Sequence, residues 1–149
     1  MYTGYFEEIE IGTTTEFGTR TVDRAEIIEF AEQFDPQPFH LDPSAAEDSV
    51  FGELVASGWH TASLTMRVMV ENGMNDSRAM GAVGVDELRW PEPVRPGDTL
   101  TVTGTVEDKQ PWSDKLGLVL ARTTVTVDER TVMSMVGRVL VERRPAETR

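Results

Sequence analysis

The segment WHTASLTMRVMVE, residues 59–71, decides the fold of this chain. Apolar side chains occupy so many of its positions that a helix built from it would have little polar surface on any side. A helix that is apolar on nearly every side belongs in the interior of a protein. We therefore predict a buried helix over residues 59–71, with the rest of the chain arranged around it.

The second half of the chain predicts what surrounds this helix. Strand-like runs are separated by turn signals at residues 91–97, 110–114 and 128–130. Residues 100–106 and 123–127 alternate with a period of two, which gives each strand one buried face. An apolar helix and a long antiparallel sheet must cover each other. The predicted fold class is therefore α+β, specifically a hotdog fold, in which an antiparallel sheet wraps around a long central helix. The runs are residues 79–90, 99–107, 116–127 and 131–142.

A strand followed by a helix is predicted for the N-terminal part. Residues 13–22 are rich in threonine and aromatic side chains, which suits a strand. Asp23 and Glu26 have the spacing of a capping box, which opens a helix. The apolar face of that helix would consist of Ile27, Phe30, Ala31 and Phe34. Residues 51–58 look irregular.

Length and composition limit the functions that the chain could have. Its 149 residues are predicted to form one domain, residues 1–149, without repeats or linkers. The absence of cysteine excludes disulfides, thiolate zinc sites and cysteine nucleophiles. A formal charge of −12 disfavours nucleic acid and anionic membranes as partners. The sequence shows no signal-peptide pattern and no apolar run of about 18 residues, so we expect a cytoplasmic protein.

The functional signal is the segment FDPQPFHLDP, residues 34–43, which holds a carboxylate and an imidazole five residues apart. Its prolines fix their own φ angles and disfavour helix in the residues before them, so Asp35 and Gln37 should be extended. A segment stiffened in this way should hold one shape. We therefore expect it to present Asp35 and His40 to one small molecule.

This segment resembles the hydratase motif of the MaoC-like, R-specific enoyl-CoA hydratases, Asp-x-Asn-Pro-hydrophobe-His, with Gln37 at the asparagine position. Residues 56–64, ASGWHTASL, resemble the start of that family's central helix. Residues 85–98, which end in RPGD, resemble its strand and turn. The resemblance covers nearly the whole chain. It implies a MaoC-like hotdog domain that reversibly adds water to a 2-enoyl thioester.

Water addition to such a thioester needs a base for the water, an acid for the α-carbon and donors for the thioester oxygen. The resemblance implies that Asp35 and His40 are the catalytic pair and hold one water molecule. It assigns the Gly58 N–H to the thioester oxygen, at a helix N-terminus that favours negative charge. A glycine there would also let the acyl group come close. The resemblance further assigns Ser63 to orienting the catalytic carboxylate.

Two further residues are candidates for substrate contact. Gln37, in place of the asparagine, leaves room for altered substrate choice. His60 is not required by the family pattern; it is better explained by packing or substrate contact than by catalysis, although it could pair with Ser63 three residues later. A metal site built from His40, Asp42 and His60 would resemble the triad of two histidines and one carboxylate that binds metal ions in other proteins. Asp42 is better explained as the N-cap of a short helix, so no metal is predicted.

The resemblance implies an acyl-CoA substrate, no cofactor beyond the CoA or acyl carrier, and a homodimer or higher even oligomer. Two alternatives stay open. A thioesterase on the same fold would use a carboxylate on the central helix, where Glu71 is the only acidic residue nearby. A non-catalytic hotdog subunit would bind acyl chains or support a catalytic partner, which the presence of Asp35 and His40 disfavours. Trp90 and Trp112 are candidates for contact with CoA, but the sequence does not assign this role to either of them.

Overall fold

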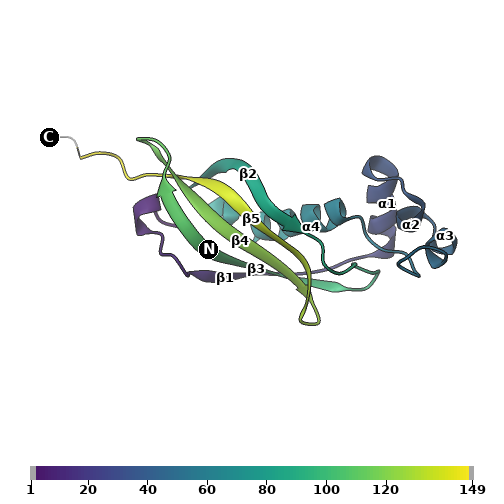
Figure 1. Ribbon diagram of the computed structural model, residues 1–149. Helices are drawn as coiled ribbons and strands as arrows, with labels where there is room; N and C mark the ends of the chain where they lie inside the picture. The colour runs from purple at the N-terminus through teal and green to yellow at the C-terminus, as the bar shows by residue number, and fades with distance from the viewer. Residues whose placement is uncertain (1–2, 148–149) are drawn as a thin grey trace.

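Residues 3–147 are described by a computed structural model, in which an antiparallel sheet and a long helix form the centre (Figure 1). The strands are β1 (Thr14–Thr21), β2 (Ala79–Arg89), β3 (Thr99–Pro111), β4 (Leu116–Val127) and β5 (Arg130–Glu142). The α-helices are α1 (Arg24–Phe34), α2 (Pro38–Leu41), α3 (Pro43–Glu47) and α4 (Gly58–Glu71). Two short 3-10 helices, η1 (Phe6–Glu8) and η2 (Met74–Asp76), complete the elements of the described residues.

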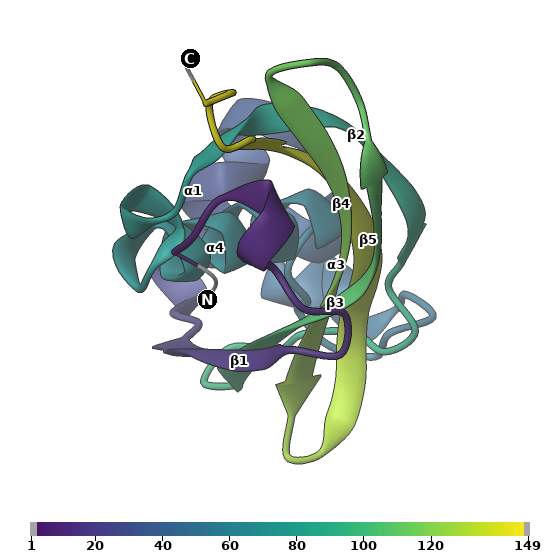
Figure 2. The ribbon, with the colours of Figure 1, turned by 90° about the vertical axis from the view of Figure 1, so that its left-hand side faces the viewer.

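The sheet curves around α4, as Figure 2 shows in a view turned by 90°. Its strands pair antiparallel in the order β1-β3-β4-β5-β2, so β1 and β2 are the edges. Each pairing contains at least one shift of register, and such bulges bend a strand and increase its twist. A curved antiparallel sheet around a central helix is the hotdog fold, and the predicted fold class is confirmed.

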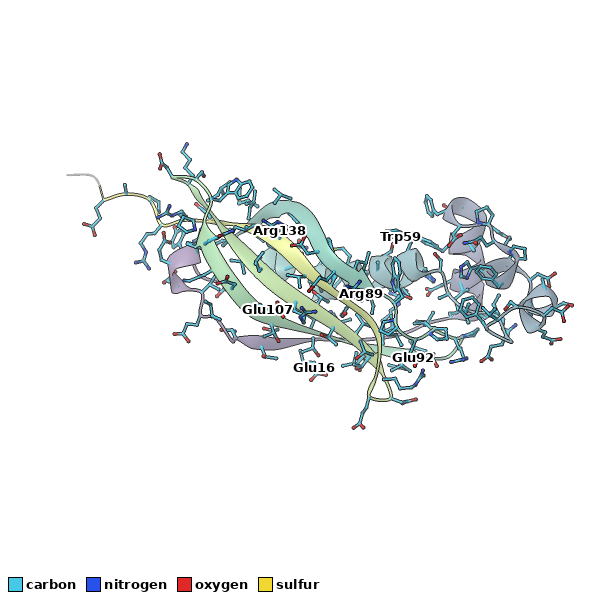
Figure 3. All side chains as sticks on the ribbon, in the orientation of Figure 1. Glu16, Trp59, Arg89, Glu92, Glu107 and Arg138 are labelled. Atoms are coloured by element: carbon cyan, nitrogen blue, oxygen red, sulfur yellow. The ribbon has the colours of Figure 1, made fainter. Side chains whose placement is uncertain are left out.

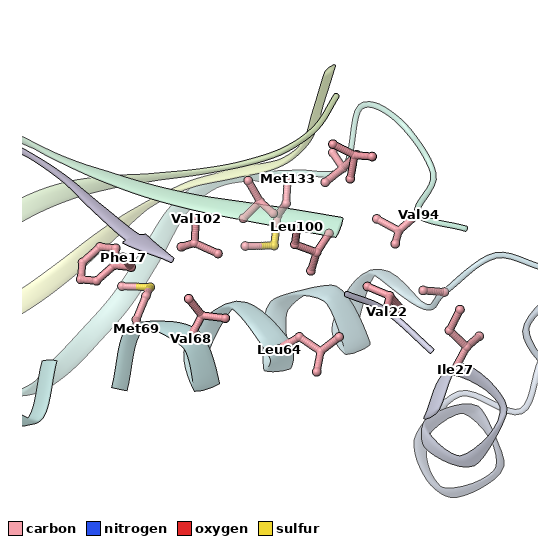
Figure 4. Packing of buried hydrophobic residues seen from close by; sticks show 14 of the residues in the cluster. Phe17, Val22, Ile27, Leu64, Val68, Met69, Val94, Leu100, Val102 and Met133 are labelled. Carbon is pink, nitrogen blue, oxygen red and sulfur yellow. The ribbon is translucent and has the colours of Figure 1, made fainter. Parts of the chain in front are cut away.

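The core fills the space between α4 and the concave face of the sheet (Figure 4). Leu64, Val68 and Met69 of α4 lie in one buried cluster with Leu100 and Val102 of β3. The alternation predicted for β3 is seen in its burial, because Leu100, Val102 and Val106 are buried and the residues next to them are not. Each fully buried side chain of this size contributes about 1.5–3 kcal/mol, so this contact holds the helix in the sheet.

One side of α4 is open, which differs from the prediction of a helix buried on every side. Trp59 is 58% exposed and Met66 is 45% exposed, and Ser63 and Arg67 are also exposed. These residues lie on the side that turns away from the sheet, since the buried residues of α4 face it. No helix within residues 3–147 is long and apolar enough to cross a membrane.

Helices α1, α2 and α3 lie together beyond the end of the sheet, beside the start of α4 (Figure 1). Ile27 of α1 is fully buried, whereas Phe34, which we expected on the buried face, is 70% exposed. The predicted capping box is also wrong. Asp23 is the N-cap, but its side chain makes no capping hydrogen bond. The Glu26 carboxylate, the other half of the predicted capping box, pairs with Arg20 at 2.9 Å instead.

Candidate active site

Asp35 and His40 meet at the junction of α1 and α2. Asp35 takes the C-cap position after Phe34, and Gln37 is extended before Pro38, the first residue of α2. The single turn of α2 carries His40 back toward Asp35, and its Nε2 lies 3.4 Å from Oδ2 of Asp35. The segment therefore brings the two side chains together, and Pro38–Leu41 form a short helix where the sequence predicted a proline-stiffened loop.

The imidazole of His40 is held in one tautomer. The residue is 6% exposed, and its Nδ1 lies 2.7 Å from the carbonyl oxygen of Val55. A carbonyl oxygen can only accept, so Nδ1 carries the hydrogen, and in the neutral form of the ring Nε2 is the acceptor. Nε2 faces the Asp35 carboxylate, which is also an acceptor. A molecule with two hydrogens to donate, such as water, would satisfy both groups.

The Asp35 carboxylate is held by two neighbouring side chains. Nε2 of Gln37 donates to Oδ1 at 2.6 Å, and the hydroxyl of Ser57 is close enough to the carboxylate to lower its pKa. Partial burial acts to raise the pKa of Asp35, but the donor groups of Ser57 and Gln37 and the nearby His40 outweigh it and lower the pKa below its ordinary value. Asp35 is therefore ionised at neutral pH, and its carboxylate is fixed in orientation.

Gly58 is the first residue of α4, and its N–H is free. Ser57 caps the helix, because its hydroxyl oxygen accepts a hydrogen bond from the Trp59 N–H at 3.3 Å. Within residues 3–147 no acceptor is paired with the Gly58 N–H. This donor points out of the N-terminus of a 14-residue helix, where the helix dipole favours negative charge.

The space beside the Gly58 α-carbon is occupied by Trp90. A Cβ built at Gly58 would lie 2.5 Å from Cε2 and 2.6 Å from Cδ2 of the indole. A side chain at position 58 therefore cannot fit unless Trp90 moves. The interpretation that a glycine is needed here for the acyl group is incomplete, because an indole ring of the protein already requires it.

All of these groups line one cavity of about 350 Å³, close to the lower end of the range of about 300–1,000 Å³ for small-molecule sites. Polar side chains gather in one part of it, namely Asp35, Gln37, His40 and Ser57. Most of the remaining wall is apolar, although Thr61 and Glu92 also line it; its large apolar side chains are Phe39, Phe51, Val55, Trp59, Trp90, Val94 and Val132. Such a cavity suits a ligand with one polar reacting group and an apolar remainder.

Ser63 lies outside this site. It is exposed, and its hydroxyl donates to the carbonyl oxygen of Trp59 at 2.7 Å, so it does not orient Asp35 as the resemblance suggested. Ser57 makes that contact instead. Serine is a preferred N-cap residue, and its place directly before Gly58 was the signal that could have identified it.

His60 is a packing residue and does not line the cavity. It is 5% exposed, and its ring stacks on Phe30 of α1 with 4.9 Å between centroids and 18° between planes. Burial lowers the pKa of His60, the Glu26 carboxylate opposes this effect and Arg20 adds to it. The ring is therefore neutral at pH 7 and joins α4 to the helix that ends at Asp35.

Asp42 caps α3, as the sequence predicts. One of its carboxylate oxygens accepts the N–H of Ser44 at 2.9 Å. His40, Asp42 and His60 do not form a metal-binding cluster, and the part of the chain that the structure describes contains no group of three or more histidine, cysteine, aspartate or glutamate side chains that could hold a metal ion.

Replacing Gln37 by leucine is expected to raise the pKa of Asp35, because the carboxylate loses a donor that favours its ionised form. Carbon-13 NMR titration of the aspartate carboxyl groups measures this pKa, with Asp35→Asn identifying the signal. Ser63→Ala is the matched control and should leave the titration unchanged, since that hydroxyl is bonded elsewhere. An Asp35 titration that is the same in Gln37→Leu and the wild type would contradict the role of Gln37.

A curved hotdog sheet with an Asp–His pair beside the start of its central helix is the arrangement that the sequence resemblance predicted. Residues 7–129 match the family described as "MaoC like domain", and the chain belongs to this family. The predicted family is therefore confirmed.

Individual relatives cover most of the chain. It is 31% identical over 142 residues to the (R)-specific enoyl-CoA hydratase of Rhodospirillum rubrum. This alignment covers 94% of this chain and 93% of that protein. It is 37% identical over 106 residues to Protein MaoC of Klebsiella aerogenes, which covers 70% of this chain but 31% of that longer protein. The crystal structure of the MaoC-like dehydratase from Rhodospirillum rubrum matches with a TM-score of 0.88 and 39% identity, covering 95% of this chain and 99% of that one.

Proposed function

We propose that this protein is a hydro-lyase that reversibly adds water to a 2-enoyl thioester. The observation that carries the proposal is the Asp35–His40 pair, in which two facing acceptors lie 3.4 Å apart in the same cavity as the free N–H of Gly58. The family and the hydratase among the relatives support it. The site residues then take the following roles.

Water is held between Oδ2 of Asp35 and Nε2 of His40. As the water oxygen bonds to C3 of the enoyl group, one of its protons passes to Nε2, and the π electrons of the C2–C3 double bond shift toward the thioester oxygen. The imidazolium then returns this proton to C2, and His40 is neutral again. Since hydroxyl and proton come from the same pair, both reach the same face of the double bond.

The other groups support the charges that develop in this reaction. Asp35 stays ionised because of its lowered pKa, accepts the second hydrogen of the water and stabilises the imidazolium. Ser57 and Gln37 keep its carboxylate in place. The Gly58 N–H donates to the thioester oxygen as it becomes enolate-like, and one such donor is typically worth a factor of about 10²–10³ in rate. The reaction as proposed uses no cofactor besides the CoA or carrier of the substrate.

The cavity contains no carboxylate from the central helix α4, which is the group that a thioesterase on this fold would use. Glu71 lies at the far end of α4, is exposed and pairs with Arg67 at 2.6 Å. It does not line the cavity that holds Asp35 and His40. The position of Glu71 therefore gives no support to hydrolysis of the thioester.

A homodimer is part of this proposal. The edge strand β2 exposes Met80, Val83 and Val85, and α4 exposes Met66 toward a groove of about 390 Å³ that also contains residues of β2. An unpaired edge strand with apolar side chains is a template for pairing with another chain, and exposed apolar patches mark interfaces. Sedimentation equilibrium should then give twice the chain mass of 16.6 kDa.

The experiment that tests the function follows crotonyl-CoA by the loss of its conjugated thioester absorbance, with a thiol reagent in a parallel sample. We expect the absorbance to fall to an equilibrium value without release of free CoA, and addition of 3-hydroxybutyryl-CoA to approach the same equilibrium from the other side. Release of thiol would identify a thioesterase. If neither reaction occurs while acyl-CoA raises the unfolding temperature, the protein is a binding subunit.

A further inference from the structure

Trp90 controls the space next to the Gly58 N–H. Its indole lies against the Gly58 α-carbon, within 2.5–3.0 Å of where a Cβ would be. The ring lines the cavity of Asp35 and His40 and is 39% exposed. Trp90 therefore forms the part of the cavity wall that lies against Gly58.

The position of this indole is fixed from several directions. Trp90 follows the last residue of β2, Arg89, which is paired with β5. A few residues later the carbonyl oxygen of Val94 accepts the N–H of Ala56 at 2.8 Å, so the segment after Trp90 is tied to the one that leads into α4. Trp59 packs edge-on against Trp90 with 5.0 Å between the ring centroids.

Trp59 lies at the start of α4, between the sheet and the helices α1–α3 (Figure 3). Both indoles line the same cavity, and edge-to-face pairs of this kind are favourable beyond the area that they bury. A large, rigid wall of two indoles next to the site leaves a cavity of only about 350 Å³. Trp90 is the side chain that occupies the space next to the Gly58 α-carbon in this cavity.

We infer that Trp90, braced by Trp59, is the specificity-determining residue that limits the acyl group to short chains. This inference rests on the proposed function, because it takes the thioester oxygen to lie at the Gly58 N–H. A short 2-enoyl group fits between the catalytic pair and the indole. A long chain meets the ring of Trp90.

The chemistry of the wall favours the acyl chain over the pantetheine arm as the group that meets Trp90. Pantetheine carries two amides, whose donors and acceptors need partners when they are buried. The wall around Trp90 includes Val94 and Val132, which are at most 3% exposed, and its carboxylate, Glu92, is paired with Arg130 at 3.9 Å. The side chains of Asp35 and His40 hold the reacting water in the proposed function. An alkyl chain has no hydrogen-bonding groups, so its burial against this wall leaves no donor or acceptor unpaired.

The test compares Trp90→Ala and Trp90→Leu with the wild type in kcat/KM for crotonyl-CoA and for trans-2-octenoyl-CoA. The ratio of octenoyl to crotonyl values should rise at least about tenfold in both variants, since even one methylene in an apolar pocket changes discrimination by about 10–200-fold. Trp112→Ala is the matched control. Trp112 is 50% exposed, follows β3 at the turn into β4 and does not line the cavity, so the ratio should stay the same.

A second test does not depend on catalysis. Calorimetry measures the affinities of the saturated butyryl-CoA and octanoyl-CoA for the wild type and each variant. The octanoyl to butyryl affinity ratio should rise in the Trp90 variants and stay constant in Trp112→Ala. If both chain lengths lose kcat/KM and affinity equally, Trp90 contacts the pantetheine arm or only supports the fold, and the inference is wrong. If the wild type hydrates neither enoyl-CoA, the proposed function fails, and the affinity ratios alone decide the role of Trp90.

Discussion

Asp35→Asn and His40→Ala are each expected to lower kcat/KM for crotonyl-CoA hydration at least about a hundredfold, the lower end of the range for acid–base groups. Asparagine has the shape of the Asp35 side chain but no charge to stabilise an imidazolium. Alanine at position 40 removes the acceptor that His40 presents at 3.4 Å from Asp35. Initial rates over a range of crotonyl-CoA concentrations measure both effects.

The two variants should also behave as parts of one unit. Because Asp35 and His40 act on the same water molecule, the double variant should be little slower than the slower single variant. Asp114→Asn is the matched control, since Asp114 is exposed in the turn between β3 and β4 and lies outside this cavity. Thermal unfolding shows that each variant is folded. Wild-type rates in folded Asp35→Asn and His40→Ala would refute the assignment of the pair.

Local sequence patterns were sufficient for the elements of the fold and for this pair. The period-two alternation from Leu100 onward reports a strand with one covered face, whatever covers it. Asp35 and His40 lie within one short segment, so prolines and a single helical turn are enough to bring them together. Such features depend on neighbours along the chain, and the sequence shows these directly.

The features that sequence did not predict depend on residues far apart in the chain. Ser57 precedes α4 and Ser63 lies within its second turn, and only the position of Asp35 in space decides which of them it meets. The contact between Trp90 and Gly58 joins the end of β2 to the start of α4. Likewise, the apolar pattern of α4 does not distinguish residues that face the sheet from those, such as Trp59 and Met66, that are exposed.

Gly58→Ala is expected to lower kcat/KM for crotonyl-CoA by about 10–100-fold, because a displacement of about 1 Å at a reacting group can cost about a hundredfold. Gly58 does not have a positive φ, so alanine fits its backbone conformation. The nearest obstacle is the indole of Trp90, which would lie 2.5 Å from the new methyl group. The ring must move, either into the cavity or away from its wall, and the thioester oxygen can then no longer settle at the N–H of residue 58.

The double variant Gly58→Ala, Trp90→Ala distinguishes two explanations for the glycine at position 58. One is the steric clash with Trp90, and the other is obstruction of the substrate. Once the indole is gone, the methyl group has room, so the double variant should recover most of the activity of Trp90→Ala alone, and the two substitutions should be strongly non-additive. If the double variant is instead as slow as the product of the single effects predicts, the methyl group obstructs the substrate itself. Position 58 would then be glycine for the acyl group, as the resemblance suggested, and the contact with Trp90 would be a consequence of that requirement rather than its cause.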